Sequence, residues 1–290
     1  MRRKCETFLN CKKEKTIYLE KNEFQIKECK TCRHRFAEIH EATTHIQNIY
    51  SDDYFQAGKQ GYPNYLDEKD ILIKSGKKYA KIVSKYSNPG RVMDVGCAAG
   101  FILKGFEQSG WECYGLEPND TMATFGRNQL NLNIKTGNLE SFHTEHQFDL
   151  ITMIQVIGHF IDVDVALKNV SNLLLGKGLV LLESWDMNSF LARLMGKHWH
   201  EYSPPSVINW FSDETLAQVF NQYGFELIAK GRPSKKISIK HGLSLFNETV
   251  PKFILKKDII EFLMSAIGKY KINYPPLDLK WYLFKRTSEY

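Results

Sequence analysis

Apolar positions in the middle of the chain follow two periods, short runs typical of strands and longer stretches with a helical repeat. The runs predict strands at 91–95, 111–116, 133–136, 148–154, 179–183 and 225–229, with helices between them at 100–109, 119–130, 163–175 and 213–223. Ser212 is placed to cap the last of these helices. Strands that alternate with helices through short connections predict a doubly wound α/β fold, a Rossmann-like parallel sheet.

The flanking segments have weaker patterns. Upstream, apolar residues between Leu72 and Tyr86 fall at helical spacing, and Asn88-Pro89-Gly90 stops the run. Downstream, we expect loop and strand over 234–246, a helix over 256–267 and a last strand over 278–285, antiparallel at the sheet edge. The chain therefore divides into four regions: a cysteine-rich region (1–45), an aromatic and helical lead-in (46–88), the core (89–232) and a C-terminal extension (233–290).

Composition narrows the class of protein. A chain of 290 residues, 43% of them hydrophobic, can bury one core with appendages. The net charge of +6 comes from scattered lysines, which favour solvated faces over a nucleic-acid surface. No apolar segment follows the basic start, and the apolar runs are too short to span a bilayer. We therefore expect a cytoplasmic protein with reduced thiols and no membrane partner.

The segment Val92–Phe101 is the most informative one. A strand ends there in a turn of small residues and a helix begins, which is where open α/β sheets bind ligands. Small residues are expected because a ligand would lie directly against the backbone. Gly96 and Gly100 do not fit the dinucleotide fingerprint, and no Gly-Lys-Ser/Thr sequence follows. Glu117 ends the next strand, where a carboxylate can accept hydrogen bonds from both hydroxyls of a ribose.

Five segments resemble motifs of the class I methyltransferases that use S-adenosylmethionine (SAM). Asp94–Gly100 resembles motif I, with Ala98 where glycine is commoner, and Gly115–Pro118 resembles the acidic second-strand motif. Gly137–Glu140 resembles the adenine-binding segment, with Asn138 in place of aspartate. Phe148–Ile151 with Gln155–Phe160 resembles the fourth strand and its ending, with Gly158 in place of glutamate. Leu175–Gly178 resembles the turn before the fifth strand.

The resemblance implies a SAM cofactor and a set of residues that bind it: Asp94, Gly96, Cys97, Gly100, Glu117, Pro118, Asn138, Leu139 and Gln155. It extends to both sides of the core. Bacterial members often carry an N-terminal zinc ribbon, an aromatic segment similar to Tyr50–Phe55 and a Trp-rich, Pro-Pro-containing stretch similar to His198–Ser212. Such relatives typically act on surface sugars or secondary metabolites.

Four of the six cysteines lie in the first region. Cys29 and Cys32 have the spacing of a metal-binding knuckle, whereas Cys5 and Cys11 are more widely spaced. The four thiolates would make a structural zinc site, since four protein ligands leave no position open for chemistry. The alternative is a degenerate ribbon with buried or free cysteines. His34 is a further candidate ligand, and Cys97 and Cys113 lie in core segments, where we expect them to be inert.

Methyl transfer from a sulfonium needs an acceptor in line with the sulfur and, for a hydroxyl, a base that removes a proton. His159 directly follows the fourth strand, at the expected mouth of the pocket. His200 is the other candidate base, with Glu201 or Tyr202 orienting it or binding substrate. A packing role is the alternative for each of these residues. Relatives often have histidine where this chain has Val207.

Three functions remain open at the level of sequence. The first is methylation of a small-molecule acceptor, with O-methylation favoured over C- or N-methylation. The second is RNA methylation, in which the lysines and the cysteine-rich region would contact phosphates. The third is a non-catalytic binding module with the same fold. The sequence leaves the acceptor and the oligomeric state undetermined.

Overall fold

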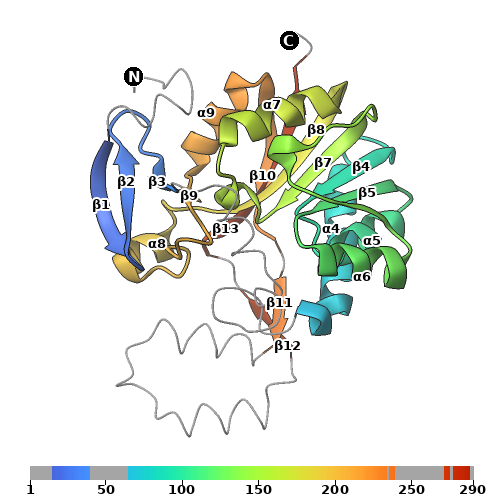
Figure 1. Ribbon diagram of the computed structural model, residues 1–290, viewed down its shortest axis with the longest axis horizontal. Coiled ribbons are helices and arrows are strands. Elements are labelled where there is room, and N and C mark those ends of the chain that lie inside the picture. Colours follow the sequence, from blue (N-terminus) through green and yellow to red (C-terminus); the bar gives the residue numbers. More distant parts are fainter. Residues whose placement is uncertain (1–14, 40–64, 234, 239–270, 275–276, 288–290) are drawn as a thin grey trace, which may run out of the picture.

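A computed structural model describes residues 15–39, 65–233, 235–238, 271–274 and 277–287 of the chain. Its centre is a seven-stranded sheet (Figure 1). In spatial order the strands are β10 (Phe225–Gly231), β13 (Leu279–Arg286), β8 (Leu174–Trp185), β7 (Phe148–Ile154), β4 (Arg91–Val95), β5 (Glu112–Glu117) and β6 (Asn133–Thr136). The strands from β8 to β6 are parallel, and β13 is antiparallel to both of its neighbours. The predicted α/β class is confirmed.

Helices cover both faces of this sheet (Figure 1). One apolar cluster packs α4 (Lys69–Val83), α5 (Phe101–Glu107) and α6 (Asp120–Leu130) on one face. A second cluster packs α7 (Val163–Leu173) and α9 (Asp213–Gln222) on the other face. Short helical turns are η1 (Tyr65–Glu68), η2 (Leu139–Ser141), η3 (Ile157–His159) and η4 (Gly196–His198). In the part of the chain that the structure describes, no helix has the length and apolar character needed to cross a membrane.

Most predicted elements lie where the sequence placed them. Strands β4, β6 and β7 have the predicted bounds, and the Ser212 side chain accepts a hydrogen bond from the backbone amide of Thr215, 3.2 Å away. The predicted turn at 175–178 is wrong, since these residues belong to β8. The register between β7 and β8 shifts at this point, so the segment forms an irregular start of the strand.

The predicted place of the last strand at the sheet edge is also wrong. Strand β13 is antiparallel, as expected, but it lies between β8 and β10, and β10 forms the edge. Consecutive residues Tyr282, Leu283 and Phe284 are all 0% exposed. Since successive side chains of a strand point to opposite faces, β13 is covered by helices on both faces and is suited to the interior of the sheet.

The N-terminal residues form an antiparallel sheet with a strand from the core. Strands β1 (Lys15–Lys21), β2 (Phe24–Cys29) and β3 (Arg35–Ala37) are followed in this sheet by β9 (Asn209–Trp210). A third apolar cluster joins this sheet to the segment that contains α8 (Phe190–Met195). The first region is therefore continuous with the core. Strands β11 (Lys235–Ser238) and β12 (Lys271–Tyr274) pair separately, and the expected helix at 256–267 and the segment Tyr50–Phe55 lie outside the described residues.

Candidate functional site

The loop between β4 and α5 is a tight turn. Gly96 has φ of +68°, Ala98 of +48° and Gly100 of +81°, a backbone region that favours glycine. A Cβ on Gly96 would lie 2.7 Å from Cγ2 of Val156, and one on Gly100 would lie 2.6 Å from Cδ1 of Leu132. Glycine is thus required at both positions by backbone conformation and by neighbouring side chains. The expectation that a ligand lies directly against this backbone stays a prediction.

Asp94 lies in β4 just before this loop and is 2% exposed. Its Oδ1 accepts a hydrogen bond from the Thr152 hydroxyl of β7 at 2.6 Å. Burial raises the pKa of Asp94 to about 7, although the Thr152 hydrogen bond opposes the shift. The side chain therefore joins the two central strands directly beneath the loop.

Glu117 ends β5 and connects the loop to the start of α6. Its Oε2 accepts from the amide of Ala98 at 2.7 Å, and its Oε1 accepts from the amide of Asn119 at 2.9 Å. Glu117 is 2% exposed, and burial raises its pKa to about 7 despite these two hydrogen bonds. Each carboxylate oxygen has two acceptor positions, so Glu117 retains capacity for two further donors. A vicinal diol supplies two such donors.

The segment after β6 lies beside Glu117. The amide of Gly137 donates to the Glu117 carbonyl at 3.0 Å, and Pro118, the first residue after β5, is half-buried. The Asn138 side chain caps η2, where its Oδ1 accepts from the amide of Ser141 at 3.1 Å. Leu139 is buried. The structure thus brings Asn138 and Leu139 to the same edge as Glu117, while their contact with an adenine stays a prediction.

Both core cysteines are buried or half-buried among apolar groups. The Cys97 thiol contacts the Ala98 carbonyl at 3.7 Å, and the Cys113 thiol contacts the Leu103 carbonyl at 3.4 Å. Burial raises the pKa of both thiols. A thiol that stays protonated is a poor nucleophile, which agrees with the expectation that both are inert.

A buried carboxylate missed by the sequence analysis lies at the carboxyl end of β8. Glu183 is 0% exposed, and its Oε1 accepts from Nε2 of Gln155 at 2.9 Å. Its Oε2 accepts from the Tyr79 hydroxyl of α4. The signal in the sequence was an acidic residue that directly follows the apolar run Leu179–Leu182. The motif resemblance predicted Gln155 as a site residue, but it did not predict Glu183, which binds the Gln155 side chain.

His159 lies in η3, after β7, and is half-buried. Its Nδ1 is 2.8 Å from the carbonyl oxygen of Ser206. A carbonyl only accepts, so the proton is on Nδ1 and a neutral ring carries its lone pair on Nε2. A Cβ on the preceding Gly158 would lie 3.1 Å from the Asn209 carbonyl and from Cγ1 of Val207, which leaves little room for the glutamate of the motif.

His200 lies between two carboxylates. Its Nε2 is 3.4 Å from Oε1 of Glu201, and its Nδ1 is 3.9 Å from Oδ2 of Asp278. The same Asp278 oxygen accepts from the Trp199 indole at 2.9 Å. Burial lowers the pKa of His200, and the charge of Asp278 opposes this. Asp278 is a further residue that the sequence did not indicate, because it lies in the C-terminal extension.

Tyr202 belongs to the packing between the N-terminal sheet and the core. It is 2% exposed, and its hydroxyl accepts from Nη1 of Arg35 at 2.5 Å. Its ring lies against Trp199, Trp210 and Tyr18. Burial raises the pKa of Tyr202. These contacts favour the packing alternative for Tyr202 over a role in the chemistry.

The proposed zinc ligands are described only in part. Cys29 is buried and Cys32 half-buried, and the amide of Arg33, the residue after Cys32, donates to the Cys29 carbonyl at 3.0 Å. Cys5 and Cys11 lie outside the described residues. Among described residues, no group of three potential ligands is close enough to hold a metal ion. The zinc site stays a prediction.

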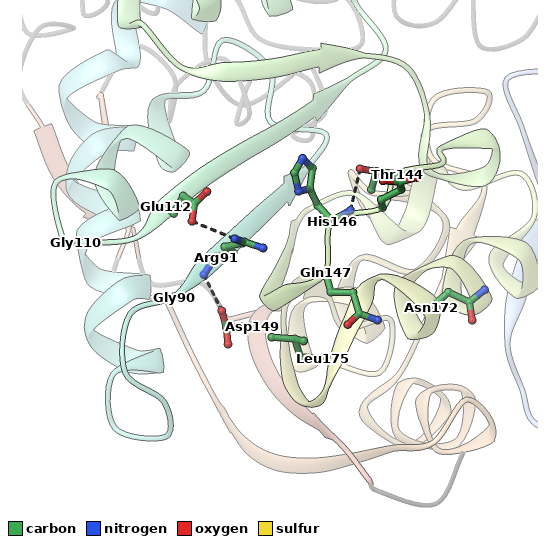
Figure 2. A pocket seen from close by; sticks show the side chains of 11 residues that line it. Gly90, Arg91, Gly110, Glu112, Thr144, His146, Gln147, Asp149, Asn172 and Leu175 are labelled. Carbon is green, nitrogen blue, oxygen red and sulfur yellow. Dashed lines mark hydrogen bonds and ion pairs between the residues drawn. The ribbon is translucent and has the colours of Figure 1, made fainter.

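A pocket of about 730 Å³ lies at the amino-terminal ends of the central strands, opposite the glycine loop (Figure 2). Its lining includes the beginnings of strands β4, β5 and β7, at Arg91, Glu112 and Asp149. Arg91 pairs with Glu112 at 3.1 Å, and its amide donates to Asp149 at 2.8 Å (Figure 2). Ligands of open α/β sheets bind at the carboxyl ends of the strands, so this pocket is separate from the candidate site.

Comparison with known proteins agrees with this geometry. Residues 72–230, more than half of the chain, match the model of a family described as a methyltransferase domain. The chain belongs to this family.

Curated relatives of this methyltransferase-domain protein include two enzymes named ubiquinone biosynthesis O-methyltransferase. The one from Rhodopseudomonas palustris (strain HaA2) is 23% identical over 208 residues, which are 68% of this chain and 78% of the relative. The one from Bradyrhizobium diazoefficiens is 24% identical over 116 residues, 38% of this chain and 46% of the relative. The chain therefore spans less than half the length of the second enzyme.

Solved structures share the fold. Magnesium protoporphyrin IX methyltransferase from Synechocystis PCC 6803, with bound SAH, has a TM-score of 0.50 at 13% identity, covering 85% of this chain and 94% of that one. The YcgJ protein from Bacillus subtilis has a TM-score of 0.52 at 20% identity, covering 75% and 99%. Both likenesses bear on the fold alone.

Proposed function

We propose that this protein transfers a methyl group from SAM to a hydroxyl group of a small molecule, a sugar or a secondary metabolite. The observation that carries the proposal is the position of Glu117. Its buried carboxylate is bonded to the Ala98 amide of the glycine loop, at the carboxyl ends of β4 and β5. That edge is where open α/β sheets bind nucleosides.

The donors and acceptors at this edge fit SAM. Glu117 has acceptor capacity for the ribose diol, and the loop at Gly96–Gly100 offers backbone groups to the methionine part. We assign Asn138 and Leu139, at the start of η2 after β6, to the adenine side. The loop itself contains no lysine or arginine for a phosphate, which agrees with a cofactor that has none. When bound, SAM supplies a methyl group already activated by the positive sulfur.

We propose His159 as the base that accepts the proton of the acceptor hydroxyl. The hydrogen bond from Nδ1 to the Ser206 carbonyl fixes the ring and places the lone pair of the neutral form on Nε2. His159 is four positions after Gln155, beyond the carboxyl end of β7. Both nitrogens of His200 face carboxylates, so His200 is better suited to hold the acceptor or its own loop, residues 197–205, which we propose covers the acceptor as a lid segment.

Hydroxyl acceptors are favoured by the relatives, whose names state that they are O-methyltransferases. A hydroxyl has to lose its proton during methyl transfer, which is the task of a neutral histidine at neutral pH. The names of the relatives and the position of His159 therefore support the same acceptor group, a hydroxyl.

The first experiment is a calorimetric titration with SAM and with S-adenosylhomocysteine (SAH) at pH 8, where a carboxyl with a pKa of about 7 is ionised. We expect micromolar binding of SAM, weakened at least about tenfold by Glu117→Ala because two charge-assisted hydrogen bonds are lost. Asp120→Ala is the matched control, since this nearby carboxylate is 74% exposed. Absence of SAM and SAH binding to folded wild-type protein would overturn the proposal.

A further inference from the structure

Glu183 has no role in the methyl transfer proposed above. It is 0% exposed at the carboxyl end of β8, yet both of its oxygens accept hydrogen bonds. A tyrosine hydroxyl and an amide N–H are among its donors, and both are hydrogen bonds that a carboxylate can accept. A buried carboxylate charge is strongly unfavourable unless hydrogen bonds or an opposite charge offset the loss of its hydration.

The surroundings of Glu183 lead directly to the glycine loop. The amide of Gln155 donates to the Glu183 carbonyl at 2.8 Å, and the Gln155 side chain donates to the carboxylate at 2.9 Å. The next residue, Val156, has its Cγ2 2.7 Å from the position of a Cβ on Gly96. Glu183, Gln155 and the loop are thus consecutive neighbours across β8, β7 and β4, on the edge assigned to the methionine part of SAM.

The backbone at Gln155 supports a role beyond packing. Its φ is +61°, a backbone region that is unfavourable for a non-glycine residue. Such strain is found where surrounding contacts hold a residue in place, commonly at ligand sites. Here the Glu183 main chain and side chain both bind Gln155. The carboxylate is also tied to α4, through Tyr79, so it is held in one position at this edge.

We propose that Glu183 is a specificity-determining residue, which makes the site bind cationic SAM in preference to the neutral product SAH. The inference rests on the proposed function. In the reaction the S–CH₃ bond breaks, its electron pair stays on sulfur, the acceptor oxygen forms the new bond, and the base takes the hydroxyl proton. The sulfur therefore loses its positive charge. A fixed carboxylate in a low-dielectric site distinguishes the two ligands by that charge.

The discrimination has a consequence for turnover. An attraction to the sulfonium exists before methyl transfer and is absent after it, so it favours release of SAH and its exchange for SAM. Because the attraction is stronger in the ground state than during transfer, it does not accelerate the chemical step. Removing it should therefore change the binding ratio of the two ligands and product inhibition, without lowering kcat through the base.

The experiment compares the Kd of SAM with the Kd of SAH, by calorimetry, in wild type and two variants. Glu183→Gln removes the charge and keeps the shape; we expect SAM to bind about tenfold more weakly and SAH to bind within about twofold of wild type. Tyr79→Phe removes one hydrogen bond and keeps the charge. This control should leave the ratio of the two constants unchanged, even where both constants shift together.

Other outcomes overturn the inference. An equal loss of affinity for both ligands in Glu183→Gln would show a structural role, and unchanged affinity for both would show no role. If Glu183→Gln does not fold, the double variant Tyr79→Phe with Glu183→Met removes the carboxylate together with its tyrosine donor, and a ratio equal to wild type in that variant would refute the inference. Failure of wild type to bind either ligand would instead refute the proposed function.

Discussion

At the scale of single residues, the hydrogen bond between His159 Nδ1 and the Ser206 carbonyl suggests a variant that tests the role of Nε2 alone. In His159→Asn, the amide nitrogen can take the place of Nδ1, while the atom corresponding to Nε2 is lost. We expect kcat to fall by about 10²–10⁴, the usual contribution of a general base, with the Kd of SAM unchanged. Single-turnover rates and calorimetry measure the two quantities.

His200→Asn is the comparison for this prediction. If His200 holds the lid or the acceptor, its variant changes KM more than kcat. A loss of kcat in His200→Asn together with full activity in His159→Asn would show that His200, and not His159, is the base. Both proteins should be screened on the same hydroxyl acceptor, so that only the side chain differs.

The site residues that sequence can indicate are those whose neighbours are local. Gly96 directly follows β4, Gly100 directly precedes α5 and Glu117 ends β5, so a pattern of strand, turn and helix is enough to place them. Tyr79 and Glu183 are 104 positions apart, and Trp199 and Asp278 are 79 apart. These pairs meet through sheet topology, which one sequence does not reveal. The turn of the glycine loop was correctly placed, but the side chains that exclude a Cβ from it, Val156 and Leu132, come from distant segments.

At the scale of elements, the contact between α4 and α5 depends on two glycines. A Cβ on Gly76 would lie 2.1 Å from the Ile102 carbonyl oxygen, and one on Gly105 would lie 2.4 Å from the Ile73 carbonyl oxygen. The obstructing atoms are backbone atoms of the partner helix, which cannot rotate away. The two helices therefore approach each other as closely as they do only because neither has a side chain at the crossing.

Gly76→Ala tests this crossing, because two effects have opposite signs. Alanine favours the helix over glycine by about 1 kcal/mol, whereas overpacking costs about 1–3 kcal/mol and the obstruction here is backbone. We expect a net decrease of about 1–2 kcal/mol in the free energy of unfolding, measured in urea. Gly176→Ala, which meets nothing within 4 Å, is the control and should change stability by less than about 0.5 kcal/mol. A more stable Gly76→Ala variant would contradict the close crossing.

Element bounds followed from local pattern, but element partners did not. The antiparallel strand predicted at 278–285 is present as β13, Leu279–Arg286, but its predicted place at the edge was wrong. Three consecutive residues buried on alternating faces are the physical sign of an interior strand. The short β9 was missed because two residues give no periodicity, and its place in the sheet comes from pairing with β3.

At the scale of the whole molecule, the N-terminal sheet and the core share one buried interface, organised by Arg35. Its Nε donates to Glu28 at 2.8 Å, its Nη1 donates to the Tyr202 hydroxyl at 2.5 Å, and its guanidinium lies 3.6 Å from the centre of the Tyr18 ring. Glu28 is 5% exposed. Arg35 thus neutralises a buried carboxylate and connects the sheet to the segment that carries His200 and Glu201.

Arg35→Met should therefore destabilise the whole protein and leave one cooperative transition. Removing one partner of a buried ion pair costs about 3–5 kcal/mol, but Arg33 also pairs with Glu28, at 2.9 Å, so we expect about 2–3 kcal/mol. Arg33→Met is the control, since that side chain is 58% exposed and its loss should cost less than about 1 kcal/mol. Tryptophan fluorescence and far-UV circular dichroism should give the same midpoint in urea, because Trp199 and Trp210 lie in the interface cluster. Two separate transitions, with only the first shifted by Arg35→Met, would show instead that the sheet unfolds independently and that the lid segment does not depend on it.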